Sequence, residues 1–357
     1  MRRVAIIGAG VGGLTTAIGL QRHGWEVAVF ERAAAPAPVG AGLSLFANGF
    51  RALDLVGAGD AVRAIAGPEQ RLTAGLRRSD GRRLTVTPPE ALCELRVVHR
   101  ADLHRVLADA LEPGTVTYGK RVEGIPDGYD VVVAADGLRS PTRGTPVRYS
   151  GWTSWRGVTS RPVDLLGAAG ESLGRGERFG LAPLPDGRVY WFGVVSVPPG
   201  TGFPDEYAEV RRRFDRWHAP IAEVLEATDP AAIVRTDIHD LARPLPTFVR
   251  GTTVLLGDAA HAMTPDLGQG ANLALEDAAT LTDLLGTRPI AEALRAYDDR
   301  RSRTQALARQ ARVMGRLLQS RSPLRDVLLR LTPPSVAARR LTAVQAWSPP
   351  EVLSARS

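Results

Sequence analysis

The residues best suited to chemistry begin at a glycine-rich turn near the start of this 357-residue chain. Gly8, Gly10 and Gly13 form the pattern G-x-G-x-x-G between a strand-like apolar run, residues 4–7, and a helical stretch, residues 14–23. In that setting the first glycine permits a tight turn, the second lets the backbone approach a pyrophosphate, and the third lets the helix pack close to the strand. The start of the helix then offers free N–H groups to the anion. The turn therefore predicts a dinucleotide-binding site.

An acidic residue completes this predicted site. Glu31 follows the next strand, residues 26–30, where its carboxylate can accept hydrogen bonds from a ribose diol. NAD, NADP and FAD all present such a ribose and a pyrophosphate, so the turn does not identify the cofactor. Arg32 fits either a 2′-phosphate or a position beside an adenine. We expect cofactor contacts from Gly8, Gly10, Val11, Gly12, Gly13, Glu31 and Arg32.

Two further motifs lie far along the chain. In AADGLRSPTR, Asp136 and Gly137 follow a run that is apolar on both faces, as expected of a central parallel strand. In TTVLLGDAAHAMTPDLGQGANLALEDAATL, Asp258 follows a buried strand and can hold a second ribose-like hydroxyl. Gly268 and Gly270 lead into a helix whose N–H groups and dipole favour a region of negative charge. A reduced flavin is such an anion.

The last motif resembles the second FAD motif of the group A flavoprotein monooxygenases, the para-hydroxybenzoate hydroxylase-like family. AADGLRSPTR resembles the same family's Asp-Gly motif, and HRADLHRVL resembles the helix whose leading arginine, here Arg100, contacts the cofactor. The resemblance covers about residues 3–300. It implies FAD contacts from Arg100, Asp136, Gly137, Asp258, Gly268, Gly270, Ala271 and Asn272. The chain departs from the family between Val122 and Asp130, where only EGIPDGY replaces extra strands, so we expect a trimmed sheet on the nucleotide side.

The resemblance also implies a reaction. In such enzymes NADPH or NADH reduces FAD, dioxygen adds to give a C4a-hydroperoxide, and one oxygen atom passes to an electron-rich ring. The expected activity is an NAD(P)H-dependent monooxygenase that hydroxylates or epoxidises an aromatic or heteroaromatic small molecule. The substrate, the regiochemistry and the choice between NADH and NADPH do not follow from the sequence.

Substrate contacts are expected where an inserted sheet faces the flavin. Arg178 and Tyr190 flank two predicted strands, and Asp266 lies in the loop under the flavin beside Pro265. An Arg, a Tyr and an Asp at these places resemble the urate-hydroxylase branch of the family, where they grip a polar heteroaromatic. His261 is either a catalytic base or a packing residue. Aromatic walls or ordinary core packing are the two interpretations of Phe179, Trp191 and Phe192.

The motifs allow three other interpretations. A flavin-dependent halogenase needs a lysine beside the flavin and a Trp-x-Trp-x-Ile-Pro motif, but Lys120 is far from such a context and WTSWR has the wrong spacing. A reductase or dehydrogenase of the same fold would keep the FAD motifs without oxygen transfer. A non-catalytic nucleotide-binding protein would use the Arg-rich C-terminal helix to bind a partner or an anionic membrane surface, although that helix also fits a solvated, packed role.

The elements that position these residues predict an α/β fold in three parts. A Rossmann-like, GR2-type FAD-binding domain is expected from residues 1–146 and 241–320, with an antiparallel β-sheet substrate domain inserted at residues 147–240. Helices are expected at residues 14–23, 48–55, 100–111 and 271–285, followed by one long helix over about residues 290–319. Residues 321–357 are expected to form a helix or a loosely ordered tail.

Composition argues against several other classes of protein. The net charge of +7 comes from arginines spread along the whole chain, which argues against nucleic-acid binding. Arg2 and Arg3 stand directly before the strand-like run at residues 4–7, which does not predict a signal peptide, so we expect a cytoplasmic protein. No apolar run reaches the roughly 20 residues needed to span a bilayer. Cys93 is the only cysteine, so an internal disulfide is excluded, and the scattered histidines predict no metal site. The oligomeric state is not predicted.

Overall fold

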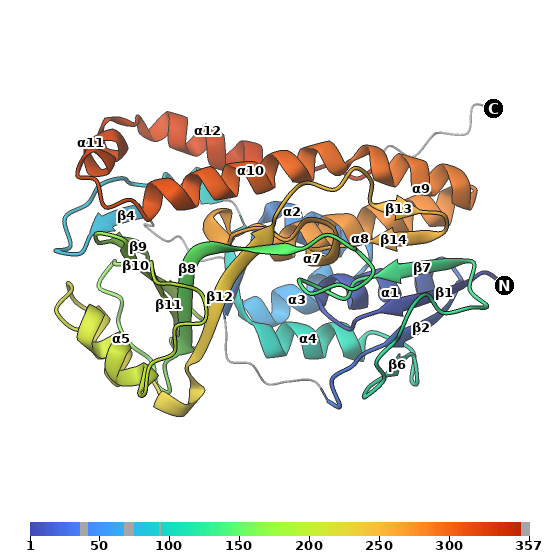
Figure 1. Cartoon of the computed structure of the whole chain (residues 1–357), viewed down its shortest axis with the longest axis horizontal. Helices are drawn as coiled ribbons and strands as arrows, with labels where there is room; N and C mark the ends of the chain where they lie inside the picture. Colours follow the sequence, from blue (N-terminus) through green and yellow to red (C-terminus); the bar gives the residue numbers. More distant parts are fainter. Residues whose placement is uncertain (36–41, 68–74, 93, 351–357) are drawn as a thin grey trace.

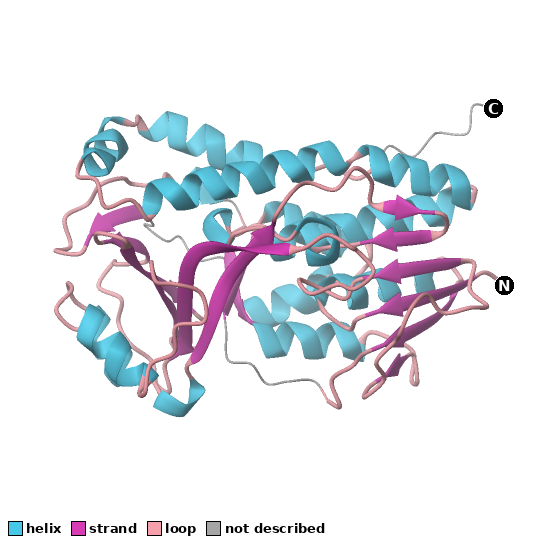
Figure 2. Cartoon of the chain, in the orientation of Figure 1, coloured by secondary structure: helices cyan, strands magenta, loops and turns pink. Residues whose placement is uncertain are grey.

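The computed structural model describes residues 1–35, 42–67, 75–92 and 94–350, so Cys93 lies outside the described residues. Two six-stranded sheets form the frame, joined by the long strands β8 and β12 (Figure 1). Helices cover the first sheet and one face of the second (Figure 2). This arrangement confirms the predicted α/β fold with an inserted antiparallel sheet.

The first sheet has the strand order β13-β14-β7-β1-β2-β6. Its four central strands, β14, β7, β1 and β2, run parallel, and β13 is antiparallel to β14. The bounds are β1 Arg3–Ile7, β2 Glu26–Phe30, β6 Val116–Thr117, β7 Val131–Ala134, β13 Val249–Arg250 and β14 Thr253–Leu255. At the edge β6 has only two residues, in keeping with the trimmed nucleotide side predicted from the short EGIPDGY segment.

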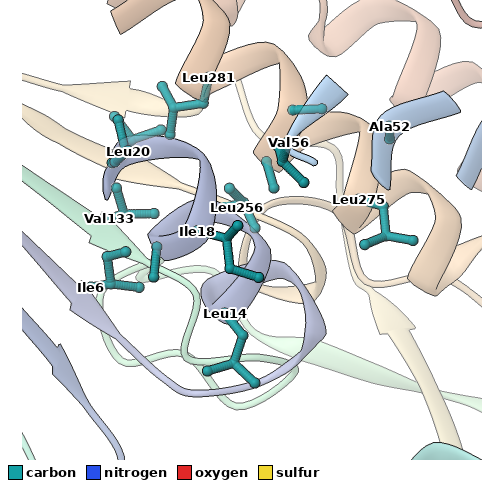
Figure 3. Packing of buried hydrophobic residues seen from close by; sticks show 14 of the residues in the cluster. Ile6, Leu14, Ile18, Leu20, Ala52, Val56, Val133, Leu256, Leu275 and Leu281 are labelled. Atoms are coloured by element: carbon teal, nitrogen blue, oxygen red, sulfur yellow. The ribbon is translucent and has the colours of Figure 1, made fainter. Parts of the chain in front are cut away.

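The helices of the first domain pack against this sheet. They are α1 Val11–Arg22, α2 Ala47–Leu55, α3 Gly59–Ala66, α4 Arg100–Asp109, α7 Asp258–His261, α8 Gly270–Thr287 and α9 Ile290–Asp299. Ile6 and Val133 of the sheet pack with Leu14 and Ile18 of α1 in the buried core (Figure 3). A Cβ on Gly19 would lie 2.7 Å from the Thr282 hydroxyl, so this glycine lets α1 and α8 approach closely. Burial of these aliphatic side chains stabilises the domain by roughly 1.5–3 kcal/mol per large residue.

The second sheet has the order β12-β8-β11-β10-β9-β4. Its bounds are β8 Val147–Val158, β9 Gly170–Leu173, β10 Glu177–Pro183, β11 Val189–Val195, β12 Val234–Leu241 and β4 Gly75–Arg78. Side-chain alternation buries Trp155, Phe179 and Trp191 on the face covered by α5 (Glu206–Phe214) and α6 (Ile221–Glu226). The opposite face is turned toward the first domain.

The edge strand β4 was not expected, because residues 75–78 precede the predicted insertion. It pairs in parallel with β9, and a Cβ on Gly170 would meet the Gly75 carbonyl oxygen at 2.3 Å. The glycine makes this close pairing possible across almost a hundred residues of sequence, which local pattern does not reveal. A separate antiparallel pair, β3 (Gly42–Leu45) with β5 (Arg96–His99), lies beside the first domain.

The C-terminal region differs from its prediction. The expected long helix is two helices, α9 and α10 (Arg301–Leu318), interrupted at Arg300, whose backbone stays near helical values. Residues 321–357 were expected to form a helix or a loosely ordered tail, and their described part contains the helices α11 (Leu324–Leu331) and α12 (Pro334–Val344). Short 3₁₀ turns complete the elements: η1 Pro89–Leu92, η2 Pro230–Ala232 and η3 Pro265–Leu267. In the described part of the chain, no helix is long and apolar enough to cross a membrane.

Helix α10 runs along both domains (Figure 1), and two of its arginines pair with carboxylates of other elements. Arg303 forms an ion pair with Glu276 of α8, and Arg312 donates to the Asp240 carboxylate of β12 at 2.7 Å. Beyond α12, Trp347 is only 4% exposed, and Arg51 donates to the Gln345 carbonyl at 2.6 Å. The segment is therefore docked by aromatic burial and by hydrogen bonds to its backbone, contrary to a loose tail.

We expect Trp347→Ala to lower the free energy of unfolding by about 3 kcal/mol, because it removes a buried aromatic side chain from the core of the first domain. Leu331→Ala serves as the control, since Leu331 is 74% exposed and its truncation should cost under about 0.5 kcal/mol. Urea-induced unfolding of the FAD-loaded protein measures both. Equal effects of the two substitutions would contradict docking of the C-terminal segment.

Candidate active site

One cavity of about 530 Å³ lies between the two domains. The first domain contributes the glycine turn, the start of α4, the loop after β7 and the loop between α7 and α8. The second sheet contributes the face opposite its own aromatic core. Of the predicted residues, the cavity is lined by Gly10, Val11, Gly12, Gly13, Arg100, Gly137, Asp258, Pro265, Gly268, Gly270, Ala271, Arg178 and Tyr190. Segments far apart in sequence thus meet at one place.

The three glycines of the turn have distinct geometries. Gly8 has φ of +106°, in the region that favours glycine, and a Cβ there would meet the Ala135 carbonyl oxygen at 2.4 Å. A Cβ on Gly13 would lie 2.0 Å from the Gly8 carbonyl oxygen, so the third glycine permits the contact between helix and strand. A Cβ on Gly10 would have no atom within 4 Å. The second glycine therefore borders open space, as the approach of a pyrophosphate requires.

Glu31 and Arg32 lie beyond the end of β2 and do not line the cavity. The Glu31 carboxylate accepts hydrogen bonds from the backbone N–H of Ala9 at 2.9 Å and from that of Ala33 at 2.8 Å. Its negative charge thus holds the glycine turn against the end of β2. Arg32 is exposed. Contact of either residue with a ribose or an adenine stays a prediction.

A buried arginine links the Asp-Gly loop to the second FAD-type motif. Arg143 is 2% exposed, and its guanidinium donates to the carbonyls of Leu138, Thr145, Asp258 and Ala259. An arginine can serve four carbonyls because its planar guanidinium carries five N–H donors in a fixed arrangement. The two distal motifs are therefore held as one unit.

Asp136 lies beside this unit without lining the cavity. Its Oδ2 accepts from the Thr142 hydroxyl at 3.2 Å, whereas its Oδ1 is buried with no hydrogen-bond partner in the described part of the chain. A buried acceptor left unsatisfied costs about 1–3 kcal/mol, which a polar ligand group would recover. Next to it, Gly137 has φ of +77° and turns the chain at the edge of the cavity.

The second FAD-type motif presents both a carboxylate and a helix start. Asp258 is exposed at the cavity, directly after Gly257 with φ of +61°. Gly268 is left-handed with φ of +63°, and α8 begins at Gly270, where a Cβ would meet nothing within 4 Å. The N-terminal N–H groups of this 18-residue helix therefore face open space.

Asn272 has a different place from the predicted cofactor contact. It is fully buried and does not line the cavity. Its Oδ1 accepts from the Phe46 N–H at 3.0 Å, and its Nδ2 donates to the carbonyls of Ser44 and Gly268. These bonds join β3 and α2 to the loop before α8, so Asn272 positions the loop.

The wall formed by the second sheet centres on a buried arginine between two carboxylates. Arg178 of β10 donates from Nη1 to Oε2 of Glu171 on β9 at 3.2 Å, and from Nη2 to Asp266 in η3. The side chains are 2% exposed for Arg178, 0% for Asp266 and 24% for Glu171. A Cβ on Gly315 of α10 would strike Asp266 Oδ2 at 2.3 Å, so this glycine leaves room for the carboxylate. The ion pair between Arg178 and Asp266 crosses the boundary between the domains.

Tyr190 and Phe192 of β11 complete the wall. Their ring centroids are 6.1 Å apart, and Gly42 packs directly on the ring of Tyr190. Burial raises the pKa of Tyr190, and the nearby Arg156 and Arg100 oppose the shift only in part. The phenol therefore stays neutral near pH 7 and keeps its proton for donation. Of the predicted aromatic walls, only Phe192 lines the cavity, since Phe179 and Trp191 stack at 5.4 Å in the core on the other face.

His261 faces away from the cavity. Its Nε2 lies 2.5 Å from Asp277 Oδ2, its ring packs beside Phe248, and its side chain is 1% exposed. Burial alone would lower the pKa of His261, but the charge and hydrogen bond of Asp277 outweigh burial and raise it. The structure thus places the predicted catalytic base in a buried ion pair behind the loop, away from the cavity lining.

Glu171 and Arg156 are among the polar residues of the wall that the sequence did not predict. Both lie on the same face of the second sheet as Arg178 and Tyr190, because the paired register is Glu171 to Gly180, Gly180 to Phe192, and Phe192 to Arg156. Alternation along each strand is visible in sequence, but the pairing of four strands is not.

These residues fit FAD. Gly10 and Gly270 border open space where phosphates and a helix-bound anion require close backbone approach, Asp258 is available to hydroxyls, and Asp136 offers a buried acceptor without a partner. Arg100, at the first turn of α4, adds a positive charge at the same cavity.

The glycine geometry gives a matched pair of substitutions. Gly10→Ala should leave the stability of the protein within about 0.5 kcal/mol but weaken FAD retention at least tenfold, because the new methyl group points into open space. Gly13→Ala should destabilise the fold by about 3 kcal/mol, because its Cβ collides with a backbone carbonyl. Flavin absorbance per chain and thermal unfolding measure the two effects. A stable, FAD-replete Gly10→Ala variant would contradict the assignment of the turn.

The buried His261–Asp277 pair makes stability depend on pH. Since the pKa of His261 is raised in the folded protein, its contribution is fully present below about pH 6.5, the unfolded value, and is lost as the pH rises through the folded pKa. The stability difference between wild type and His261→Gln should therefore be largest near pH 6 and shrink toward pH 9. Chemical unfolding at several pH values measures it. A difference that stays constant with pH would show that the pair does not titrate.

Comparison with known proteins is consistent with this geometry. The chain matches the family described as FAD binding domain over residues 1–134 and 128–311. It is 40% identical over 309 residues to aurachin C monooxygenase/isomerase of Stigmatella aurantiaca, covering 79% of this chain and 80% of the relative. It is 34% identical over 344 residues to an FAD-dependent urate hydroxylase of Klebsiella pneumoniae, covering 87% and 88%.

Comparison with solved structures gives the same result as comparison of the sequences. The crystal structure of Klebsiella pneumoniae HpxO complexed with FAD and uric acid superposes with a TM-score of 0.87 at 29% identity, covering 96% of each chain. The family match spans most of the chain, and the two relatives cover 79% and 87% of it. The chain therefore belongs to the FAD binding domain family and is an FAD-dependent monooxygenase of the group A flavoprotein type.

Proposed function

We propose that the cavity takes a small, planar heteroaromatic substrate between Pro265 and the polar face of the second sheet, and that the enzyme hydroxylates it there. The observation that carries the proposal is the pair of uncommitted donors on this wall. The Tyr190 hydroxyl and the Arg156 guanidinium both belong to the cavity, and neither has a hydrogen bond within the described residues. They share this cavity with the residues that fit FAD.

Bound FAD supplies the redox and oxygen chemistry, at the expense of NADH or NADPH. The protein contributes binding and orientation. The glycine turn and the start of α8 offer backbone N–H groups to negative charge, and Asp258 offers a carboxylate to hydroxyls. Arg100 adds a cation at the rim of the same cavity.

The second sheet orients the substrate. Tyr190 is a neutral donor, because burial raises its pKa, and the ring of Phe192 offers a flat apolar surface beside it. Arg178 does not reach out as a free fork, since both of its terminal nitrogens already contact carboxylates. Its part is to hold Glu171 and Asp266 in place at the wall.

The names of the relatives support this substrate class. Urate is the substrate named for the Klebsiella pneumoniae hydroxylase, and the HpxO structure that superposes on this chain was solved with uric acid. Uric acid is a polar, planar heteroaromatic, which fits the mixed wall of hydroxyl, guanidinium and aromatic ring described here. We therefore extend the substrate class, though not the individual substrate, to this chain.

A panel of aromatic and heteroaromatic compounds should contain members that stimulate NADH or NADPH oxidation by the FAD-loaded enzyme. With ¹⁸O₂, the best of them should yield a product carrying one labelled oxygen atom, because a monooxygenase transfers one atom of dioxygen. Mass spectrometry of the product measures the label. Stimulated oxidation of the nicotinamide with only hydrogen peroxide formed for every compound would contradict hydroxylation.

Tyr190→Phe should lower kcat/KM for the best substrate about tenfold, since a hydrogen bond to a neutral hydroxyl is worth about 0.5–1.5 kcal/mol. FAD content and thermal stability should stay unchanged, because the hydroxyl has no partner among the residues that the structure describes. Tyr207→Phe is the matched control: its hydroxyl donates to the Leu225 carbonyl at 3.2 Å outside the cavity, and its loss should not alter kcat/KM. Equal kinetics for wild type and Tyr190→Phe would remove Tyr190 from the site.

A further inference from the structure

The second sheet presents two acidic residues to the cavity, Asp237 on β12 and Glu171 on β9. The Asp237 carboxylate accepts hydrogen bonds from the Thr153 hydroxyl, the Gly200 N–H and the Arg235 guanidinium. Within the described residues, Glu171 accepts only from Arg178. Its side chain is 24% exposed and lines the cavity, whereas Asp266, the other carboxylate on Arg178, is fully closed off. Burial raises the pKa of Glu171, and the neighbouring Arg178 counteracts this only in part. A substrate that enters the cavity therefore meets a carboxyl group at β9.

The arginine behind this carboxyl group is not free to bind an anionic group of a substrate. The Arg178 guanidinium has one positive charge and two carboxylate partners, one on Nη1 and one on Nη2. Its side chain is 2% exposed, and its Nε is buried without a partner. A carboxylated substrate at this end would therefore approach Glu171 and find the guanidinium already occupied. Like charges placed together in an interface cost several kcal/mol.

The opposite end of the same wall is basic. The register places Glu171, Gly180, Phe192 and Arg156 side by side across four strands, three spacings of about 4.8 Å or roughly 14 Å in all. Gly180 has no side chain, and a Cβ there would lie 2.1 Å from the tip of the Phe192 ring. The phenyl ring thus lies over Gly180. An aromatic floor connects an acidic end at Glu171 with a basic end at Arg156.

We propose that Glu171 is the specificity-determining residue of the site: it accepts a hydrogen bond from an N–H or O–H group of the substrate, and it excludes aromatic compounds that carry a carboxylate at that end. This inference rests on the proposed function, because it assigns the orientation and class of the substrate in that cavity. A ring N–H directed at β9 would satisfy Glu171, while the carbonyl or hydroxyl side of the ring would point toward Tyr190 and Arg156.

The simpler role for Glu171 is that of a structural counter-ion for Arg178. The two roles differ in what they predict. A counter-ion affects stability and the position of Arg178 for every ligand alike. A recognition residue changes the ratio of affinities between ligands that differ only in the group facing it, because a site built to accept a hydrogen bond rejects the analogue that lacks the donor.

Equilibrium binding to the FAD-loaded enzyme tests the inference with three matched probes: 4-quinolone, its N-methyl derivative and its 2-carboxylate. Binding is followed by the perturbation of the flavin absorbance spectrum, which requires no turnover. In wild type, 4-quinolone should bind at least tenfold more tightly than the N-methyl derivative and at least a hundredfold more tightly than the carboxylate. In Glu171→Gln, both ratios should fall at least tenfold.

Two variants separate charge from packing. Glu171→Asp keeps the negative charge and should keep the discrimination against the carboxylate, although the shorter side chain should weaken the preference for N–H. Glu223→Gln removes one exposed carboxylate elsewhere in the same domain and should change neither ratio. Flavin content and thermal unfolding of each variant confirm that the site is intact before affinities are compared.

The inference is overturned if Glu171→Gln shifts all three affinities by the same factor, or if wild type binds the carboxylate as tightly as 4-quinolone. It is equally overturned if 4-quinolone leaves the wild-type flavin spectrum unchanged, since the donor class would then be wrong. The proposed function is judged separately, by oxygen-18 in the product. If Glu171 discriminates between the probes but no labelled oxygen enters the product, the inference stands and the proposed hydroxylation is wrong.

Discussion

The site depends on one buried guanidinium shared by two carboxylates. Arg178 comes from the inserted sheet, Asp266 from the loop of the FAD-binding domain, and Glu171 from the neighbouring strand. Removing Arg178 would cost about 3–5 kcal/mol, because the buried Asp266 carboxylate would then have neither water nor a counter-ion. The two domains are therefore fixed relative to one another where the cavity forms. The missing side chain at Gly315 of α10 is part of this arrangement, since any larger residue would occupy the place of the Asp266 carboxylate.

A second buried guanidinium holds separate segments together within the FAD-binding domain. Arg143 donates to carbonyls on both the Asp-Gly loop and the start of α7, and Asn272 joins the loop before α8 to β3. Neither side chain lines the cavity. Both satisfy backbone carbonyls that irregular loops leave without helix or sheet partners. Polar side chains of the FAD-type motifs therefore hold the loops in place. Backbone N–H groups are thus positioned for an anion, and Asp258 is positioned for its hydroxyls.

The sequence predicted the parts of the site that depend on local geometry. A tight turn, a close contact between helix and strand, and a helix start each require particular residues at fixed offsets, so Gly8, Gly13 and Gly270 could be assigned without a structure. Arg178 and Tyr190 were placed through resemblance to a known family. Glu171 was not, because its position opposite Gly180 depends on which strands pair and in which register. The same reason explains β4, whose partner lies almost a hundred residues away, and Trp347, which lies beside Phe248, Glu276 and Tyr297 from distant parts of the chain.

The two domains have different roles, and this difference explains how the same flavin chemistry can act on different substrates. The residues that fit FAD come from the ends of parallel strands and the starts of helices, where backbone groups carry most of the contacts. The wall that we propose for the substrate is one face of an antiparallel sheet, where each position is a side chain that can change without altering the backbone ladder. Alternation separates this face from the core that stabilises the domain, since Phe179 and Trp191 point the other way. A residue such as Glu171 can therefore set the charge of the pocket at little cost to the fold, provided that Arg178 remains neutralised from the other domain by Asp266.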